Sequence, residues 1–129
     1  MRAAELGAVI YAGVCRENFA PATSCALASE LGAAAGAAVY DISNACLGVM
    51  NGILDLANRI ELGQIRAGLV ATCESARGIN EIALARMLQS GNMAGFKASL
   101  ATLTGGSGAA AVVVTDGSFG APAHEPADG

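Results

Sequence analysis

Apolar residues along the chain gather into four nearly continuous short runs. The runs span residues 6–12, 37–42, 65–72 and 109–115, and Val, Ile, Leu and Ala dominate them. Runs that are apolar at successive positions are typical of strands buried on both faces. We therefore expect these segments to form a mostly parallel sheet with helices packed on each side, which is an α/β fold.

The segments between the runs carry helical signals. Thr23 or Ser24 has the chemistry to cap a helix that runs to Leu31 and stops at Gly32. A longer helix is expected over 47–62, because its apolar residues recur with a period close to 3.6.

Shorter elements complete the pattern. The residues Ser43-Asn44 form a turn with capping chemistry before the long helix, and a loop is expected at 74–80. Two short helices follow at 79–88 and 94–103. The tail from residue 116 is rich in Gly, Pro, Ala and Asp and is predicted to be mostly loop.

The composition narrows the class of protein. Hydrophobic residues make up 53% and charged residues 14%, a balance that excludes a disordered tail. The 29 Ala and 17 Gly predict backbones that pack closely. The net charge is −4 and the seven Lys and Arg are scattered, so the basic stripe that nucleic-acid binding requires is missing.

Other features predict a cytoplasmic protein with reduced thiols. No apolar run reaches the roughly 18–20 residues of a membrane span, and the N-terminus lacks the apolar stretch of a signal peptide. The four cysteines include no CxxC pair, and His124 is the single histidine. A zinc knuckle, a thioredoxin-type site and a pair of histidine metal ligands are therefore not expected.

Cys46 is the residue with the strongest chemical signal. It lies where a predicted strand meets a long helix, and the N–H groups at a helix N-terminus stabilise a thiolate and an oxyanion. Gly48 beside it would leave room for an acyl group. The alternative is a buried cysteine that serves as a small hydrophobic residue.

The remaining candidates favour structural roles. Cys15, Cys25 and Cys73 are expected to pack, and His124 in the tail is expected to be a solvated surface residue. The glycine-rich stretch Gly105–Gly108 lacks the lysine of a phosphate-binding loop and precedes a strand, so it predicts a tight turn.

The stretch from Asp41 to Gly52, DISNACLGVMNG, resembles the nucleophile motif of the thiolase superfamily. It is most similar to the β-ketoacyl-(acyl carrier protein) synthase III branch. Four further stretches resemble this family in the same order: Pro21–Cys25, Ile60–Val70, Leu103–Ala111 and His124–Gly129. Five matches in order are far more specific than one.

The resemblance implies a thiolase-like fold and an acyltransferase of lipid synthesis. Cys46 would be the nucleophile, and its backbone N–H would help to hold the oxyanion. The substrates would be acyl-CoA or acyl-(acyl carrier protein), with no bound cofactor and no metal. The family's homodimer would bring the loop Phe19-Ala20-Pro21 toward the active site of the partner.

The closest resemblance is to the subgroup that condenses two acyl-CoA molecules in bacterial olefin synthesis. In that subgroup a Glu precedes the loop proline, whereas this chain has Ala20, which argues against the non-decarboxylating reaction. The family's catalytic His and Asn lie in a C-terminal half, and the role of that His is not carried over to His124. Residues 1–129 therefore resemble an incomplete N-terminal half, inactive alone, and a non-catalytic homologue that only packs or dimerises is the alternative.

Overall fold

The computed structural model describes residues 1–16 and 19–120. Its contacts divide the chain into two compact units, and each is described by itself. The first comprises Met1–Thr72 and the chain from Ala111 onward, and the second comprises Cys73–Ala110. His124, and with it most of the predicted tail, lies outside the described residues.

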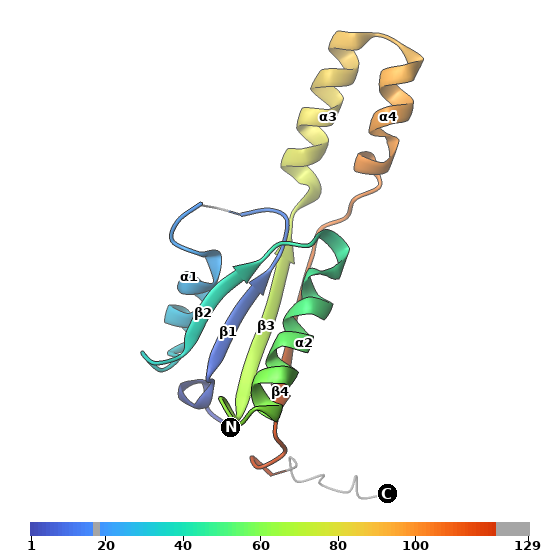
Figure 1. Cartoon of the computed structure of the whole chain (residues 1–129). Helices are drawn as coiled ribbons and strands as arrows, with labels where there is room; N and C mark the ends of the chain where they lie inside the picture. Colours follow the sequence, from blue (N-terminus) through green and yellow to red (C-terminus); the bar gives the residue numbers. More distant parts are fainter. Residues whose placement is uncertain (17–18, 121–129) are drawn as a thin grey trace, which may run out of the picture. The chain divides into compact units, whose positions relative to one another are not determined.

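Four strands form one sheet in the order β2-β1-β3-β4 (Figure 1). The central strand β1 (Ala8–Ala12) runs parallel to both β2 (Ala38–Ile42) and β3 (Ala67–Glu74). The fourth strand, β4 (Gly108–Thr115), runs antiparallel to β3. The residue after the end of β4, Asp116, lies beside the residue before the start of β3, and its N–H donates to the carbonyl of Arg66 at 2.9 Å. The predicted α/β fold with a mostly parallel sheet is confirmed.

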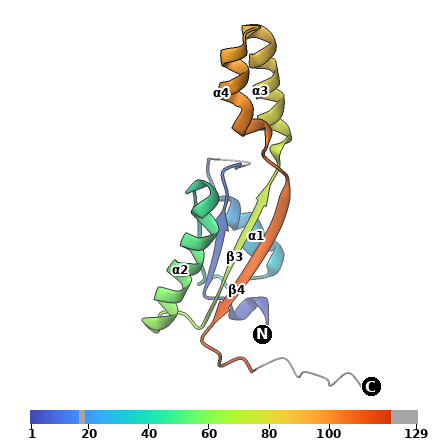
Figure 2. The ribbon, with the colours of Figure 1, turned by 90° about the vertical axis from the view of Figure 1, so that its right-hand side faces the viewer.

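Two helices cover the opposite faces of this sheet (Figure 2). Val9 of β1 belongs to the core beneath α1 (Thr23–Leu31), whereas its neighbour Ile10 packs with Leu56 of α2 (Gly48–Glu61). Successive strand residues point to opposite faces, so one apolar run supplies both cores. Val9, Ile10 and Leu56 are fully buried.

Glycines let α2 lie close to the strands. A Cβ added at Gly52 would lie 2.9 Å from Val70 Cγ1, and one added at Gly68 would lie 2.3 Å from Leu56 Cδ2. Gly48 is also buried, and its Cβ position faces Ala12 of β1. At Gly48 the added Cβ would lie 3.5 Å from that of Ala12, which is ordinary contact, and its predicted role in leaving room for an acyl group stays a prediction.

The predicted helix caps in this unit are wrong. Helix α1 begins at Thr23 after the cap position Ala22, which makes no side-chain cap bond. Ser43-Asn44 does not cap the long helix either, since the 3-10 helix η2 (Ala45–Leu47) intervenes and neither Asn44 nor Leu47 makes a side-chain cap bond. The start of α1 is instead held by a side chain from another element, the carboxylate of Asp41 in β2.

The second unit is a helical hairpin of α3 (Ala76–Ser90) and α4 (Met93–Leu103). The loop predicted at 74–80 is wrong, because β3 continues to Glu74 and α3 begins two residues later. The N–H of Ala76 donates to Ser107 Oγ at 3.1 Å, so a residue 31 positions away supports the helix start. None of the helices in the described part of the chain has the length and apolar character of a membrane span.

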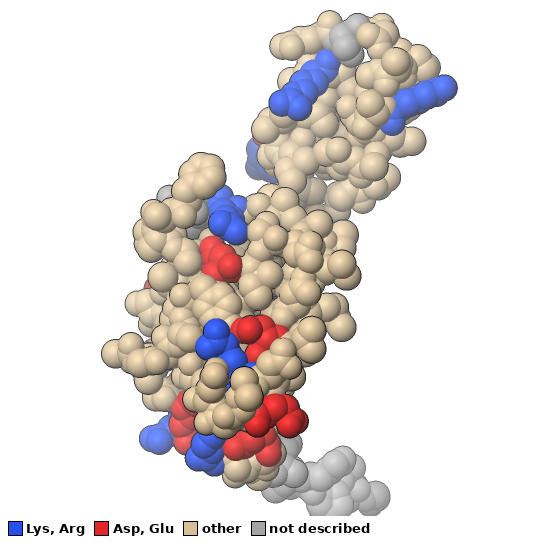
Figure 3. Space-filling model, in the orientation of Figure 1, with Lys and Arg blue, Asp and Glu red and all other residues tan. Residues whose placement is uncertain are grey.

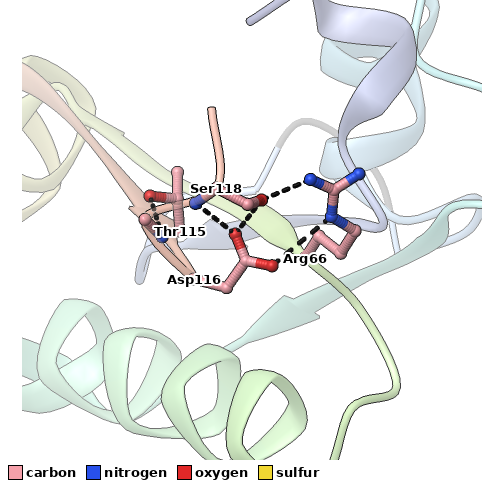
Figure 4. Close-up of polar contacts among 5 residues, drawn as sticks. Arg66, Thr115, Asp116 and Ser118 are labelled. Atoms are coloured by element: carbon pink, nitrogen blue, oxygen red, sulfur yellow. Dashed lines mark hydrogen bonds and ion pairs between the residues drawn. The ribbon is translucent and has the colours of Figure 1, made fainter. Parts of the chain in front are cut away.

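A polar cluster joins the start of β3 to the end of β4 (Figure 4). Arg66 pairs with the carboxylate of Asp116 at 3.4 Å and donates to the hydroxyl of Ser118. Its guanidinium also lies 4.9 Å from the centroid of the Phe119 ring.

Near the N-terminus, the short 3-10 helix η1 (Ala3–Glu5) leads into β1.

Candidate active site

Cys46 lies just past the carboxyl end of β2, within η2 and directly before α2. Its side chain is exposed, so it does not serve as a buried hydrophobic residue. No disulfide joins any of the four cysteines, all of which are in the described part of the chain. Cys15 and Cys25 are partly buried, but Cys73 is exposed, which contradicts its predicted packing role.

The chain turns sharply at the residue before Cys46. Ala45 has a φ of +44°, and it is the one residue other than glycine with a positive φ in the described part of the chain. This left-handed conformation costs an L-residue roughly 1–2 kcal/mol. The turn leads from the extended β2 into η2 and α2, and it places Cys46 at the tip of the bend. We call residues 43–47 the elbow.

Hydrogen bonds hold the elbow on both sides of the strained residue. The N–H of Leu47 donates to the carbonyl of Asn44 at 3.0 Å. The Asn44 side chain donates from Nδ2 to Oδ1 of Asn51 in α2, at 2.6 Å. No local pattern in the sequence indicates this pair, because Asn44 at a turn is equally typical of a helix cap.

The loop Phe19-Ala20-Pro21 follows β1 and lies at the same carboxyl edge of the sheet as the elbow. The two strands end together, since Ala12 of β1 pairs with Ile42 of β2. All three loop residues are exposed, and the Ala20–Pro21 peptide bond is cis. The parallel pairing thus brings the predicted loop and Cys46 to one edge, which is where ligands bind in open α/β sheets.

Asp41 ties these two segments together, and the sequence analysis missed its role. Its carboxylate accepts hydrogen bonds from the N–H of Thr23 at 2.8 Å, and from the N–H and Oγ of Ser24 at 2.9 and 2.8 Å. Partial burial raises the pKa of Asp41, but the bonds from Ser24 and Thr23 outweigh it, and the pKa lies below its usual value. The signal for this role in the sequence is the charge of Asp41 within the otherwise mostly apolar run 37–42.

A second polar cluster joins β2 to α2 away from the elbow. The Tyr40 hydroxyl donates to the carboxylate of Asp55, which also pairs with Arg59 Nε at 2.9 Å. Burial, followed by the bond to Asp55, raises the pKa of Tyr40 to about 12. Tyr40 therefore stays protonated at neutral pH, and the cluster fastens the edge strand to the helix rather than supplying an acid or a base.

Comparisons with known proteins find similar alkyltransferases. An acyl-CoA:acyl-CoA alkyltransferase of Shewanella oneidensis is 63% identical over 116 residues, which are 90% of this chain and 33% of that protein. The chain is homologous to the acyl-CoA:acyl-CoA alkyltransferases. The alkyltransferase of Xanthomonas campestris is 34% identical over 111 residues, which are 85% of this chain and 33% of that protein. No family model matches the chain.

Solved structures agree with this alkyltransferase homology. Crystal structures of Xanthomonas campestris OleA, one with cerulenin bound and one with acetamide bound, each superpose with a TM-score of 0.86 at 32% identity. Each match covers 92% of this chain and 37% of the OleA chain. The predicted resemblance to a thiolase-fold condensing enzyme is confirmed. The chain spans about a third of the length of the curated relatives it matches.

Proposed function

We propose that the whole protein condenses two acyl thioesters through an acyl-enzyme formed on Cys46. The observation that carries this proposal is the 63% identity to an acyl-CoA:acyl-CoA alkyltransferase over nine-tenths of the chain. The exposed thiol on its elbow, at the carboxyl edge of the sheet, supports it. The name of this relative favours CoA thioesters over carrier-protein thioesters as substrates.

The reaction would proceed in two steps. The Cys46 thiolate attacks the carbonyl carbon of the first acyl thioester, a C–S bond forms, and the CoA thiolate leaves. The backbone N–H of Cys46 helps to hold the oxyanion during this attack. The second acyl thioester loses an α-proton, or CO2 in the decarboxylating version, to give a carbanion at its α-carbon. This carbanion attacks the carbonyl of the acyl-enzyme, a C–C bond forms, the C–S bond to Cys46 breaks, and the Cys46 thiolate is released. The groups that generate this carbanion are expected outside residues 1–129.

The second step has two candidate versions. A non-decarboxylating condensation of two acyl-CoA molecules is favoured by the names of both relatives. A decarboxylating condensation, as in the synthase III branch, is favoured by Ala20, which places a methyl group where the olefin-pathway subgroup has a carboxylate. Condensation with a malonyl thioester or with an unactivated acyl-CoA, followed by product mass, separates the two.

We propose that residues 1–129 form an N-terminal half that functions within a larger fold, in a cytoplasmic homodimer. The apolar residues on the solvent side of α2 support this proposal, because further parts of the protein could cover them. Leu47 before the helix and Met50 and Leu54 within it are all large, apolar and exposed. Their spacing of three and four positions puts them on one stripe of the helix. Thiols without disulfides support the cytoplasmic location.

Acyl transfer to Cys46 provides the test. The protein as its gene encodes it is incubated with a long-chain acyl-CoA, digested, and analysed by mass spectrometry. We expect the acyl mass on the Cys46 peptide and its loss in Cys46→Ala. Cys73→Ala is the matched control, because Cys73 is the other exposed thiol, and it should retain full labelling.

The alternative of a non-catalytic homologue predicts a different result. Such a protein would take up no acyl group on any thiol, although it would still fold. Labelling of Cys73 in place of Cys46 would refute the nucleophile assignment.

A further inference from the structure

The conformation of Ala45 needs support from its surroundings. Its φ of +44° is costly for a residue with a Cβ, and such a conformation persists where neighbouring contacts hold it. Cys46 follows directly, so the direction of its side chain depends on this turn. Any contact that spans the turn therefore acts on the orientation of the thiol.

One side chain from outside the elbow spans this turn. The hydrogen bond from Asn44 Nδ2 to Asn51 Oδ1 bridges seven positions and encloses Ala45 and Cys46 between its two ends. The other bond at this place, from the Leu47 N–H to the Asn44 carbonyl, is internal to the elbow. Asn51 therefore links the elbow to the rigid body of α2.

Asn51 has no evident packing role to explain its presence. Its side chain is exposed, in contrast to its buried neighbour Gly52. Asparagine is also a poorer helix former than leucine or alanine, so it gives the helix no intrinsic stability. The bond to Asn44 is the contact of the Asn51 side chain that the structure shows.

We propose that Asn51 is a positioning residue for the Cys46 nucleophile. Its carbonyl oxygen holds Asn44, and through Asn44 it keeps the elbow in the orientation in which the thiol meets a thioester carbonyl. This inference rests on the proposed acyl transfer to Cys46. Attack on a bound thioester requires a narrow range of approach, so small displacements of the nucleophile slow it strongly. Reaction with a small, freely diffusing alkylating agent has no such requirement.

The test compares these two reactions of the same thiol. In the protein as its gene encodes it, Asn51→Leu should slow acylation of Cys46 by a long-chain acyl-CoA about tenfold. Alkylation of Cys46 by iodoacetamide should stay within about twofold of the original rate, because the thiol is already exposed. Asn51→Asp keeps the acceptor oxygen and should restore most of the acylation rate.

The matched control is Asn58→Leu, the same exchange at an exposed position of the same helix. It should leave both rates unchanged. The inference is overturned if Asn51→Leu acylates at the original rate, if it slows both reactions equally, or if Asn51→Asp is as slow as Asn51→Leu. If the unaltered protein shows no acylation of Cys46, the proposed function itself fails, and this inference fails with it.

Discussion

The two units of the chain bury their apolar residues to very different extents. In the unit that holds the sheet, Val9, Ile10 and Leu56 are completely buried. In the hairpin of α3 and α4, Ala83 is the one buried hydrophobic residue among those described, whereas Leu88 is 84% and Met93 65% exposed. The charged residues of the two hairpin helices are Arg77, Glu81, Arg86 and Lys97, and uncharged residues make up most of the hairpin surface in Figure 3.

The difference follows from how apolar residues are arranged in each unit. Strands of the sheet present alternate residues to two faces, and a helix covers each face. In α3, the exposed apolar residues Ile82, Leu84 and Leu88 do not share one stripe, so a single partner helix leaves part of them uncovered. Both units leave apolar side chains uncovered, the sheet unit along α2 at Leu47, Met50 and Leu54 and the hairpin over most of its helices, but only the sheet unit also contains a buried core among the described residues.

The largest expected effect is the loss of stability when a large apolar side chain is shortened, which should differ between the two units. Leu56→Ala should lower the free energy of unfolding by about 2–5 kcal/mol, because it leaves a cavity between α2 and the sheet. Leu88→Ala, the same exchange in the hairpin, should change it by less than about 0.5 kcal/mol. Urea denaturation measures both. Equal losses would contradict the contrast between the units.

A smaller effect concerns the long-range cap within the sheet unit. Asp41→Asn should lower the free energy of unfolding by about 1 kcal/mol at neutral pH, which is the usual contribution of a helix cap. Because the pKa of Asp41 is lowered in the folded state, its carboxylate contributes full stability above the ordinary Asp value of about 3.9. That contribution disappears as the pH falls through the lower folded-state pKa.

The pH dependence provides the check. The difference in unfolding free energy between the original protein and Asp41→Asn should stay constant above the ordinary Asp pKa of about 3.9 and shrink as the pH falls below it. Glu30→Gln, at an exposed position near the other end of α1, is the control and should stay within about 0.5 kcal/mol at neutral pH. A difference that is constant with pH would mean that the charge of Asp41 has no role.

The smallest effect compares one ion pair in each unit. Asp55 pairs with Arg59 and also accepts from Tyr40, whereas Glu81 of the hairpin pairs only with Arg77 among the described partners. Asp55→Asn should lower the free energy of unfolding by up to about 1 kcal/mol, and Glu81→Gln should lower it by less than about 0.5 kcal/mol. Raising the salt concentration should weaken the exposed pair further. Thermal unfolding that shows the larger loss in Glu81→Gln would contradict this order.

Much of the fold could be predicted from the sequence because its signals are local. Continuous apolar runs predicted all four strands to within two residues at every end, and a period of 3.6 predicted the helix after Cys46. The junction between strand and helix singled out Cys46, and the structure places this thiol there with its side chain exposed.

The rest was decided by contacts between residues distant in sequence. Asp41 holds the start of α1 from the next strand, and Ser107 supports the start of α3. Asn44 and Asn51 are only seven positions apart, but they meet only because the elbow turns the chain into α2. No local pattern indicates which side chain will meet a helix end or a turn, because that depends on how strands pair and how closely helices pack. The sequence by itself therefore determined the strands, the long helix and the nucleophile position. Only the tertiary structure decided which segments surround that nucleophile, since the parallel pairing of β1 with β2 and the bonds from Thr23 and Ser24 to Asp41 form only after the chain has folded back on itself.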